Sequence, residues 1–221
     1  MRSRTLSFVL AAALGLMASS CGGGADLGSE RADQVRAAAL EAGLPDDVAD
    51  VLALAARGTT ATYRITYAGT DGAEVVVSQD PPDHRLDVVT GGVVVESRVL
   101  RDGVGYRCQL EEGATLDCER SEAAVDAPGT FTDVALDRFV EELADGADRF
   151  DISVEDRSIA GVDATCLVTA PKAGTPIDGE GPGVDTLCLS PEGVQLLTDS
   201  GGERVVASDY STEVAPDAFE L

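Results

Sequence analysis

Most of this chain alternates between short apolar runs and turn residues, and that pattern constrains its fold more than any other feature. Tyr63, Ile65 and Tyr67 alternate with polar residues, which is typical of a strand with one buried face. Similar runs follow, separated by glycine-rich turns or by Asp102-Gly103, a pair typical of tight hairpins. The pattern predicts a large sheet built from consecutive antiparallel strands.

Helical patterns occur in only two places, before the first strand and in the middle of the chain. We expect helices over residues 31–42, 46–57 and 132–144. We expect strands over residues 63–67, 75–77, 86–89, 93–100, 105–110, 116–119, 150–155, 164–169, 186–189, 194–198 and 203–211. This order predicts an α+β fold in which one antiparallel sheet carries its helices on one side. Residues 31–221 are expected to form a single domain.

The first two dozen residues resemble the signal peptide of a bacterial lipoprotein. Arg2 and Arg4 precede an apolar run over residues 6–17, and small residues lead to Cys21, which is followed by glycines. The run is shorter than the ~20 residues that a membrane-spanning helix needs. Ordinary secretory cleavage after Ser20 would fit the same small residues and leave Cys21 as a free thiol. We favour cleavage before Cys21 and acylation of its thiol.

These features predict the location of the mature protein. The signal peptide is residues 1–20, and residues 21–30 are expected to be the lipidated cysteine and a flexible tether. Nine extended residues reach at most ~30 Å, so the domain would lie close to the bilayer. The expected location is extracytoplasmic, at the outer face of the cytoplasmic membrane, with the acyl chains of Cys21 as the membrane anchor.

Charge narrows the range of partners. The chain has 40 acidic and 16 basic residues and a formal net charge of −24. Such a surface is repelled by nucleic acid and by bare anionic headgroups, so we expect no nucleic-acid partner. We expect a monomer that depends on its acyl anchor, rather than on charge, to stay at the membrane.

Four further cysteines indicate disulfides, because the expected compartment is oxidising. Cys108, Cys118, Cys166 and Cys188 allow three pairings. We favour Cys108–Cys118 and Cys166–Cys188, since each pair brackets a hairpin-like segment, and each bridge would stabilise the fold by ~2–4 kcal/mol. A zinc site is disfavoured, because the cysteines lack C-x-x-C spacing and the chain has one histidine.

The residues that could carry chemistry are few. The single histidine, His84, follows two prolines and is expected to be a solvated turn residue with no nucleophile beside it. Arg85 and Asp87 share one side of a strand, and a local ion pair is favoured over a ligand contact. No motif of a hydrolase, metalloprotease or phosphate-binding loop is present. We therefore expect a non-enzymatic protein without a cofactor.

Two acidic groups are interpreted as solvated surface. Asp145, Asp148 and Asp151 lack the Asp-x-Asp-x-Asp-Gly spacing of a calcium loop, so helix-end solvation is favoured. Glu111-Glu112 is expected to be an exposed hairpin tip.

Three motifs resemble the family of the lipoprotein carrier LolA, in its actinobacterial lipoprotein branch. Pro81-Pro82-Asp83-His84-Arg85-Leu86-Asp87 resembles its Pro-Pro-x-x-Arg-x-Asp stretch. Asp102-Gly103-Val104-Gly105-Tyr106 resembles a hairpin that follows in these proteins, and Cys188 to Val194 resembles a later one. The resemblance implies a strongly curved antiparallel half-barrel with helices covering its concave side.

The resemblance also implies a function. Related proteins include mycobacterial lipoproteins that carry lipoglycans, and regulators of the RseB type. We expect binding or shuttling of a lipid or other apolar ligand at the cell envelope. The alternatives are a sensor that binds a membrane protein partner, and a scaffold with a closed core. The chain has no Trp, 5 Phe and 4 Tyr, so a cavity would be lined by Val, Leu and Ala; its ligand-binding residues are not assigned.

Overall fold

The computed structural model describes residues 24–69, 72–111, 115–122, 131–174 and 184–221. The predicted signal peptide, Cys21, Glu112 and the predicted loops over 123–129 and 175–183 lie outside these residues. The helices are α1 (Gly24–Glu41), α2 (Asp46–Gly58) and α3 (Asp133–Gly146). The strands are β1 (Tyr63–Ala68), β2 (Ala73–Asp80), β3 (Asp83–Thr90), β4 (Val93–Arg101), β5 (Val104–Leu110), β6 (Leu116–Arg120), β7 (Phe150–Ile159), β8 (Val162–Pro171), β9 (Asp185–Leu189), β10 (Gln195–Ser200) and β11 (Glu203–Ser211).

All eleven strands form one antiparallel sheet, in the order β6-β5-β4-β3-β2-β1-β11-β10-β9-β8-β7. Each pair of neighbouring strands is also consecutive in the chain, except at the centre, where the first strand pairs with the last. The sheet does not close, because β6 and β7 are at its two ends. The predicted α+β fold with a large antiparallel sheet is confirmed.

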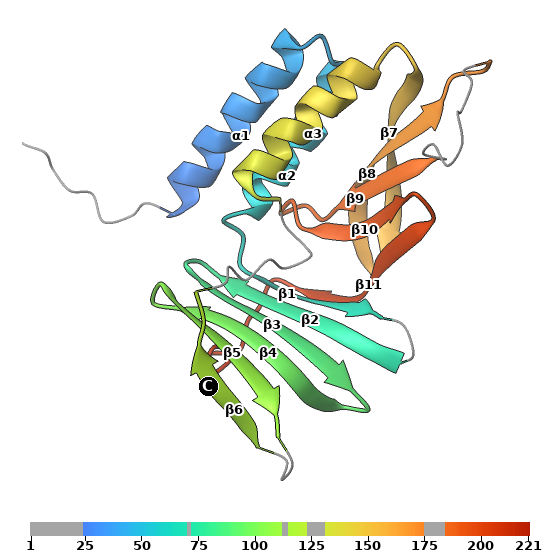
Figure 1. Cartoon of the computed structure of the whole chain (residues 1–221). Helices are drawn as coiled ribbons and strands as arrows, with labels where there is room; N and C mark the ends of the chain where they lie inside the picture. The colour runs from blue at the N-terminus through green and yellow to red at the C-terminus, as the bar shows by residue number, and fades with distance from the viewer. Residues whose placement is uncertain (1–23, 70–71, 112–114, 123–130, 175–183) are drawn as a thin grey trace, which may run out of the picture.

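The three helices pack together against the β7–β9 part of the sheet (Figure 1). Helix α2 is the central one, and its buried side includes Val48, Leu52 and Ala55. One buried cluster joins these residues to Ala32, Val35 and Ala39 of α1, to Leu136, Val140 and Leu143 of α3, and to Leu167, Leu187 and Leu189 of the sheet. Burying such side chains is the main force that holds the helices on the sheet.

A second buried cluster lies where the two halves of the sheet meet. Tyr63 and Ile65 of β1 are fully buried in it, with Val77 and Leu86 from the neighbouring strands. Val194 and Leu196 reach the same cluster from the β9–β10 region. The chain therefore has two adjacent cores, one beneath the helices and one at the β1–β11 junction.

Two glycines let the end of α2 approach the β9–β10 turn. A Cβ atom on Gly58 would lie 2.3 Å from the carbonyl oxygen of Gly193, and one on Gly193 would lie 1.9 Å from that of Leu54. Real Cβ atoms do not occur at such distances. This backbone contact fixes the helical layer against the turn, which continues into strand β10.

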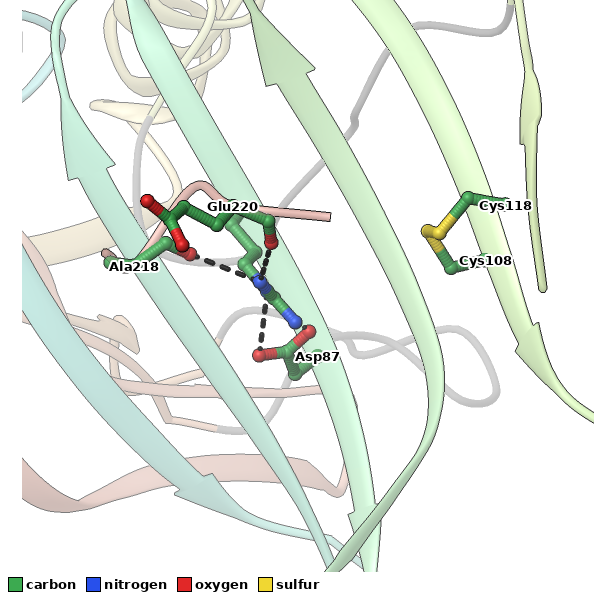
Figure 2. Close-up of a disulfide and its surroundings, with 6 residues drawn as sticks. Asp87, Cys108, Cys118, Ala218 and Glu220 are labelled. Atoms are coloured by element: carbon green, nitrogen blue, oxygen red, sulfur yellow. Dashed lines mark hydrogen bonds and ion pairs between the residues drawn. A yellow bond between two sulfur atoms is a disulfide. The ribbon is translucent and has the colours of Figure 1, made fainter. Parts of the chain in front are cut away.

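The favoured disulfide pairing is confirmed. Cys108 and Cys118 are directly opposite each other on β5 and β6, with sulfurs 2.04 Å apart. Cys166 and Cys188 are opposite on β8 and β9, with sulfurs 2.08 Å apart. Figure 2 shows the first bridge near the outer edge of the sheet. The second lies in the core at the β1–β11 junction, where both of its cysteines are fully buried.

After β11 the chain turns back, and residues 212–221 return to strand β3. Arg85 forms the predicted ion pair with Asp87, with Nε 2.8 Å from Oδ1 and both side chains largely buried. Its Nη1 also donates to the carbonyl oxygens of Ala218, at 3.1 Å, and Glu220, at 2.8 Å (Figure 2). One guanidinium group thus holds the C-terminal segment against the sheet.

The expected tether over residues 21–30 is wrong for its larger part, because α1 begins at Gly24 rather than at residue 31. Gly28 is buried, and a Cβ atom there would lie 2.2 Å from the Thr60 hydroxyl oxygen. The glycine that suggested flexibility instead lets the first turns of α1 pack against the end of α2. No described helix is long and apolar enough to span a bilayer.

Candidate functional site

A hollow of about 480 Å³ lies between α3 and strands β7–β10. We call it the α3 pocket. It is lined by Phe131, Phe139, Glu142, Leu143, Gly146, Phe150, Ile152, Leu167, Thr169, Asp185, Thr186, Leu187, Gln195, Thr198, Asp199 and Ser200. The walls therefore combine one face of a helix with one edge of the sheet.

Helical periodicity explains the contribution of α3. Phe139, Leu143 and Gly146 are spaced by four and three residues, so they lie on one face of the helix. The helix begins where the Thr132 hydroxyl accepts a hydrogen bond from the amide of Ala135 at 3.2 Å. Threonine is common at this position, because its hydroxyl satisfies an amide that has no partner within the first turn of the helix.

Strand register explains the contribution of the sheet. Leu167, Leu187 and Thr198 are directly opposite one another on β8, β9 and β10, so they form one row on one face. Thr169 and Asp185 are opposite each other in the next row. The floor changes from leucine to a polar residue within two positions along β8 and along β9, which produces an apolar interior and a polar rim.

Aromatic side chains provide the bulkiest walls. Phe131 and Phe139 stack with ring centroids 5.6 Å apart, and Phe150 closes the pocket beside Gly146. The prediction of walls made of Val, Leu and Ala holds for leucine alone, because the lining includes neither Val nor Ala. Those residues are instead used in packing α1 and α2, for example Val48 of α2.

The charged residues that line the α3 pocket are all acidic, namely Glu142, Asp185 and Asp199. Glu142 is 2.7 Å from Arg138 on the exposed side of α3. Asp185 accepts a hydrogen bond from the amide of Gly201 at 3.3 Å. The pocket therefore has apolar walls and a polar rim whose charged groups are negative.

His84 is not the solvated turn residue that the sequence predicts. It lies within β3, opposite Gln79 on β2 and Leu100 on β4. Its Nε2 atom is buried and has no hydrogen-bond partner among the described residues. Burial lowers the pKa of His84, because the imidazolium form loses hydration there. The histidine is separate from the α3 pocket, whose lining does not include it.

A buried polar network holds the β9–β10 turn. The Ser190 hydroxyl donates to the Glu192 carboxylate at 2.9 Å and accepts from the amide of Val194 at 3.3 Å. The Tyr210 hydroxyl donates to the same carboxylate at 2.7 Å. Burial raises the pKa of Tyr210 above its ordinary value. Ser190 is fully buried, so its contacts stabilise the turn that Gly193 presses against α2.

The acidic groups considered in the sequence do not converge. Three of these residues lie near the end of α3 and are exposed, namely Asp145, Asp148 and Asp151. Glu111 is exposed too, at the β5–β6 hairpin. Within the described ranges, no group of three or more His, Cys, Asp or Glu side chains could hold a metal ion.

Comparison with known proteins adds no relative. No family model matches the chain, and no curated protein sequence matches it significantly.

Proposed function

We propose that this protein is an exported, membrane-anchored lipoprotein that binds a lipid or other apolar molecule in the α3 pocket. The observation that carries the proposal is the pocket itself. Its volume of about 480 Å³ falls within the range of ~300–1,000 Å³ typical of small-molecule sites. A filled core would have placed side chains in that space.

The lining favours an apolar body with a polar end. Phe131, Phe139 and Phe150 offer large apolar surfaces, and the leucine row beneath them is also apolar. Moving each methylene of a ligand from water into such walls contributes ~0.8 kcal/mol. Thr169 and Asp185 at the rim offer hydrogen-bonding groups for a head group. This distribution suits an amphiphile of modest size better than a polar metabolite.

The sequence supports the location. The signal-like start and Cys21 favour export and acylation. The two disulfides support an oxidising compartment, because such bridges are rare in the cytosol. The resemblance to LolA-like carriers favours a curved half-barrel, and the supporting observation is a single open antiparallel sheet with helices against one part of it.

The test is native mass spectrometry of the mature protein purified from a bacterial membrane with its disulfides intact. Extra mass that is lost on denaturation and enters organic solvent would identify the cargo. The variant Phe139→Ala should lose this mass, because it removes one wall of the pocket. Phe219→Ala is the matched control, since Phe219 lies in the C-terminal segment outside the pocket.

Two outcomes would contradict the proposal. A bare protein mass with no uptake of added single-chain amphiphiles would exclude a ligand-binding pocket and direct the search to protein partners. Equal loss of cargo in both phenylalanine variants would place the ligand elsewhere on the protein.

A further inference from the structure

Two exposed large apolar side chains lie in the first turns of helices. Leu27, in the first turn of α1, is 63% exposed, and Val134, in the first turn of α3, is 79% exposed. They are more exposed than Val93, Val184 or Val205 elsewhere on the described surface. Each leaves an apolar side chain in water at an end of the helical layer.

These two helix starts lie side by side (Figure 1). Arg31, one turn after Leu27, has its Nε 3.0 Å from Asp133 and its Nη2 2.7 Å from Asp137. Asp133 is the residue before Val134. A hollow of about 370 Å³ opens at this end and is lined by residues that include Leu27, Arg31 and Asp133. We call this surface the helix-start end.

The helix-start end is also the end nearest Cys21. Three peptide units separate Cys21 from Gly24, so their Cα atoms are at most about 11 Å apart. Leu27 follows three residues later in the helix, a rise of only about 4.5 Å. The headgroup layer of a bilayer leaflet is about 5–7 Å thick. An acyl chain on Cys21 therefore keeps Leu27 within about 16 Å of the anchor, a distance from which it can reach the headgroup layer.

We propose that the helix-start end docks on the bilayer, with Leu27 and Val134 inserted among the lipid headgroups. This inference rests on the proposed acylation of Cys21. The anchor makes docking an intramolecular event, so a small apolar surface is sufficient to orient the domain. Without the anchor, two side chains do not hold the protein on a membrane.

The charge of the helix-start end determines the type of bilayer on which it can dock. Asp133 and Asp137 pair with Arg31 at this end, Glu30 lines the same hollow, and the whole chain is strongly acidic. Such a surface is not attracted by anionic lipid. Docking therefore depends on apolar insertion and occurs on a zwitterionic bilayer.

Docking places the α3 pocket next to its source of ligand. Phe131, a wall of the pocket, is two residues before Asp133 of the helix-start end. The pocket extends from there along α3 to Gly146. An apolar molecule that leaves the outer leaflet beside the anchor would meet the Phe131 end of the pocket first.

The experiment uses the absence of tryptophan from the chain. Single tryptophans are introduced by Leu27→Trp and Val134→Trp, with Val93→Trp and Val205→Trp on the sheet as controls. Each full-length protein is produced in a bacterial host, and its mass shows whether Cys21 is acylated. Each is then placed in phosphatidylcholine vesicles whose acyl chains carry bromine, which quenches tryptophan at short range. A parallel set receives a synthetic lipid on the Cys21 thiol of unacylated protein.

We expect a blue shift and strong quenching for the tryptophans at positions 27 and 134, and neither effect at positions 93 and 205. Addition of anionic lipid should not strengthen the quenching. Equal quenching at all four positions, or none at position 134, would overturn the docking proposal. Absence of acylation from the host-produced protein would instead refute the anchoring part of the proposed function, while the synthetic lipid still tests docking.

Discussion

Replacing Gly193 with alanine should lower the free energy of unfolding far more than the same change at another glycine with a similar positive φ. Gly193 has a φ of 88°, and an alanine there would force its Cβ to within 1.9 Å of the Leu54 carbonyl oxygen. The left-handed backbone costs about 1–2 kcal/mol for alanine. Forcing α2 away from the turn adds about 1–3 kcal/mol of the kind measured for overpacking. We expect Gly193→Ala to lower the free energy of unfolding by about 2–5 kcal/mol.

Gly161→Ala is the matched control for this prediction. Gly161 has a similar φ of 77°, but nothing lies within 4 Å of an added Cβ atom. Gly161→Ala should therefore lower the free energy of unfolding only by the cost of the left-handed backbone, about 1–2 kcal/mol. Equilibrium unfolding in urea, with the disulfides intact, measures both values. Equal losses in the two variants would refute the claim that the α2–turn contact holds the helical layer in place.

Two further predictions concern β3. Arg85→Ala removes the hydrogen bonds that a charged donor makes to the C-terminal segment, each contributing about 1.5–3 kcal/mol. Carboxypeptidase should therefore digest residues 212–221 faster in this variant. Digestion at the wild-type rate would show that Arg85 does not hold this segment. The lowered pKa of His84 means that the unfolded chain binds a proton at higher pH than the folded one. The free energy of unfolding should fall as the pH drops below about 6.5, the ordinary pKa of histidine, and His84→Gln should reduce that fall; identical pH profiles would contradict the buried position.

Local signals were sufficient to predict the sheet. The Asp102-Gly103 pair was recognised as a hairpin turn, and both residues have positive φ, at 52° and 74°. Alternation around Ile65 located β1, because one face of that strand is buried in the junction core. The disulfides followed from the hairpins, since cysteines opposite each other on neighbouring strands can pair.

Features that depend on distant parts of the chain could not be predicted in the same way. His84 was assigned to a turn because of the adjacent prolines, but the turn occupies only Pro81 and Pro82, and strand pairing begins at Asp83. The α3 pocket needs Phe131, Phe139 and Phe150 together, and their proximity depends on how α3 lies over β7. No spacing rule within the sequence brings those three rings to one site.

The central claim is that the α3 pocket holds an apolar molecule, and photocrosslinking tests it most directly. A fatty acid that carries a diazirine near its terminal carbon would be bound to the mature protein, irradiated, and mapped by peptide mass spectrometry. The account predicts labelling of peptides from α3 and from β7–β9, competed by the unlabelled fatty acid and reduced in Phe139→Ala. Labelling spread over the sheet without competition, or none at all, would contradict it.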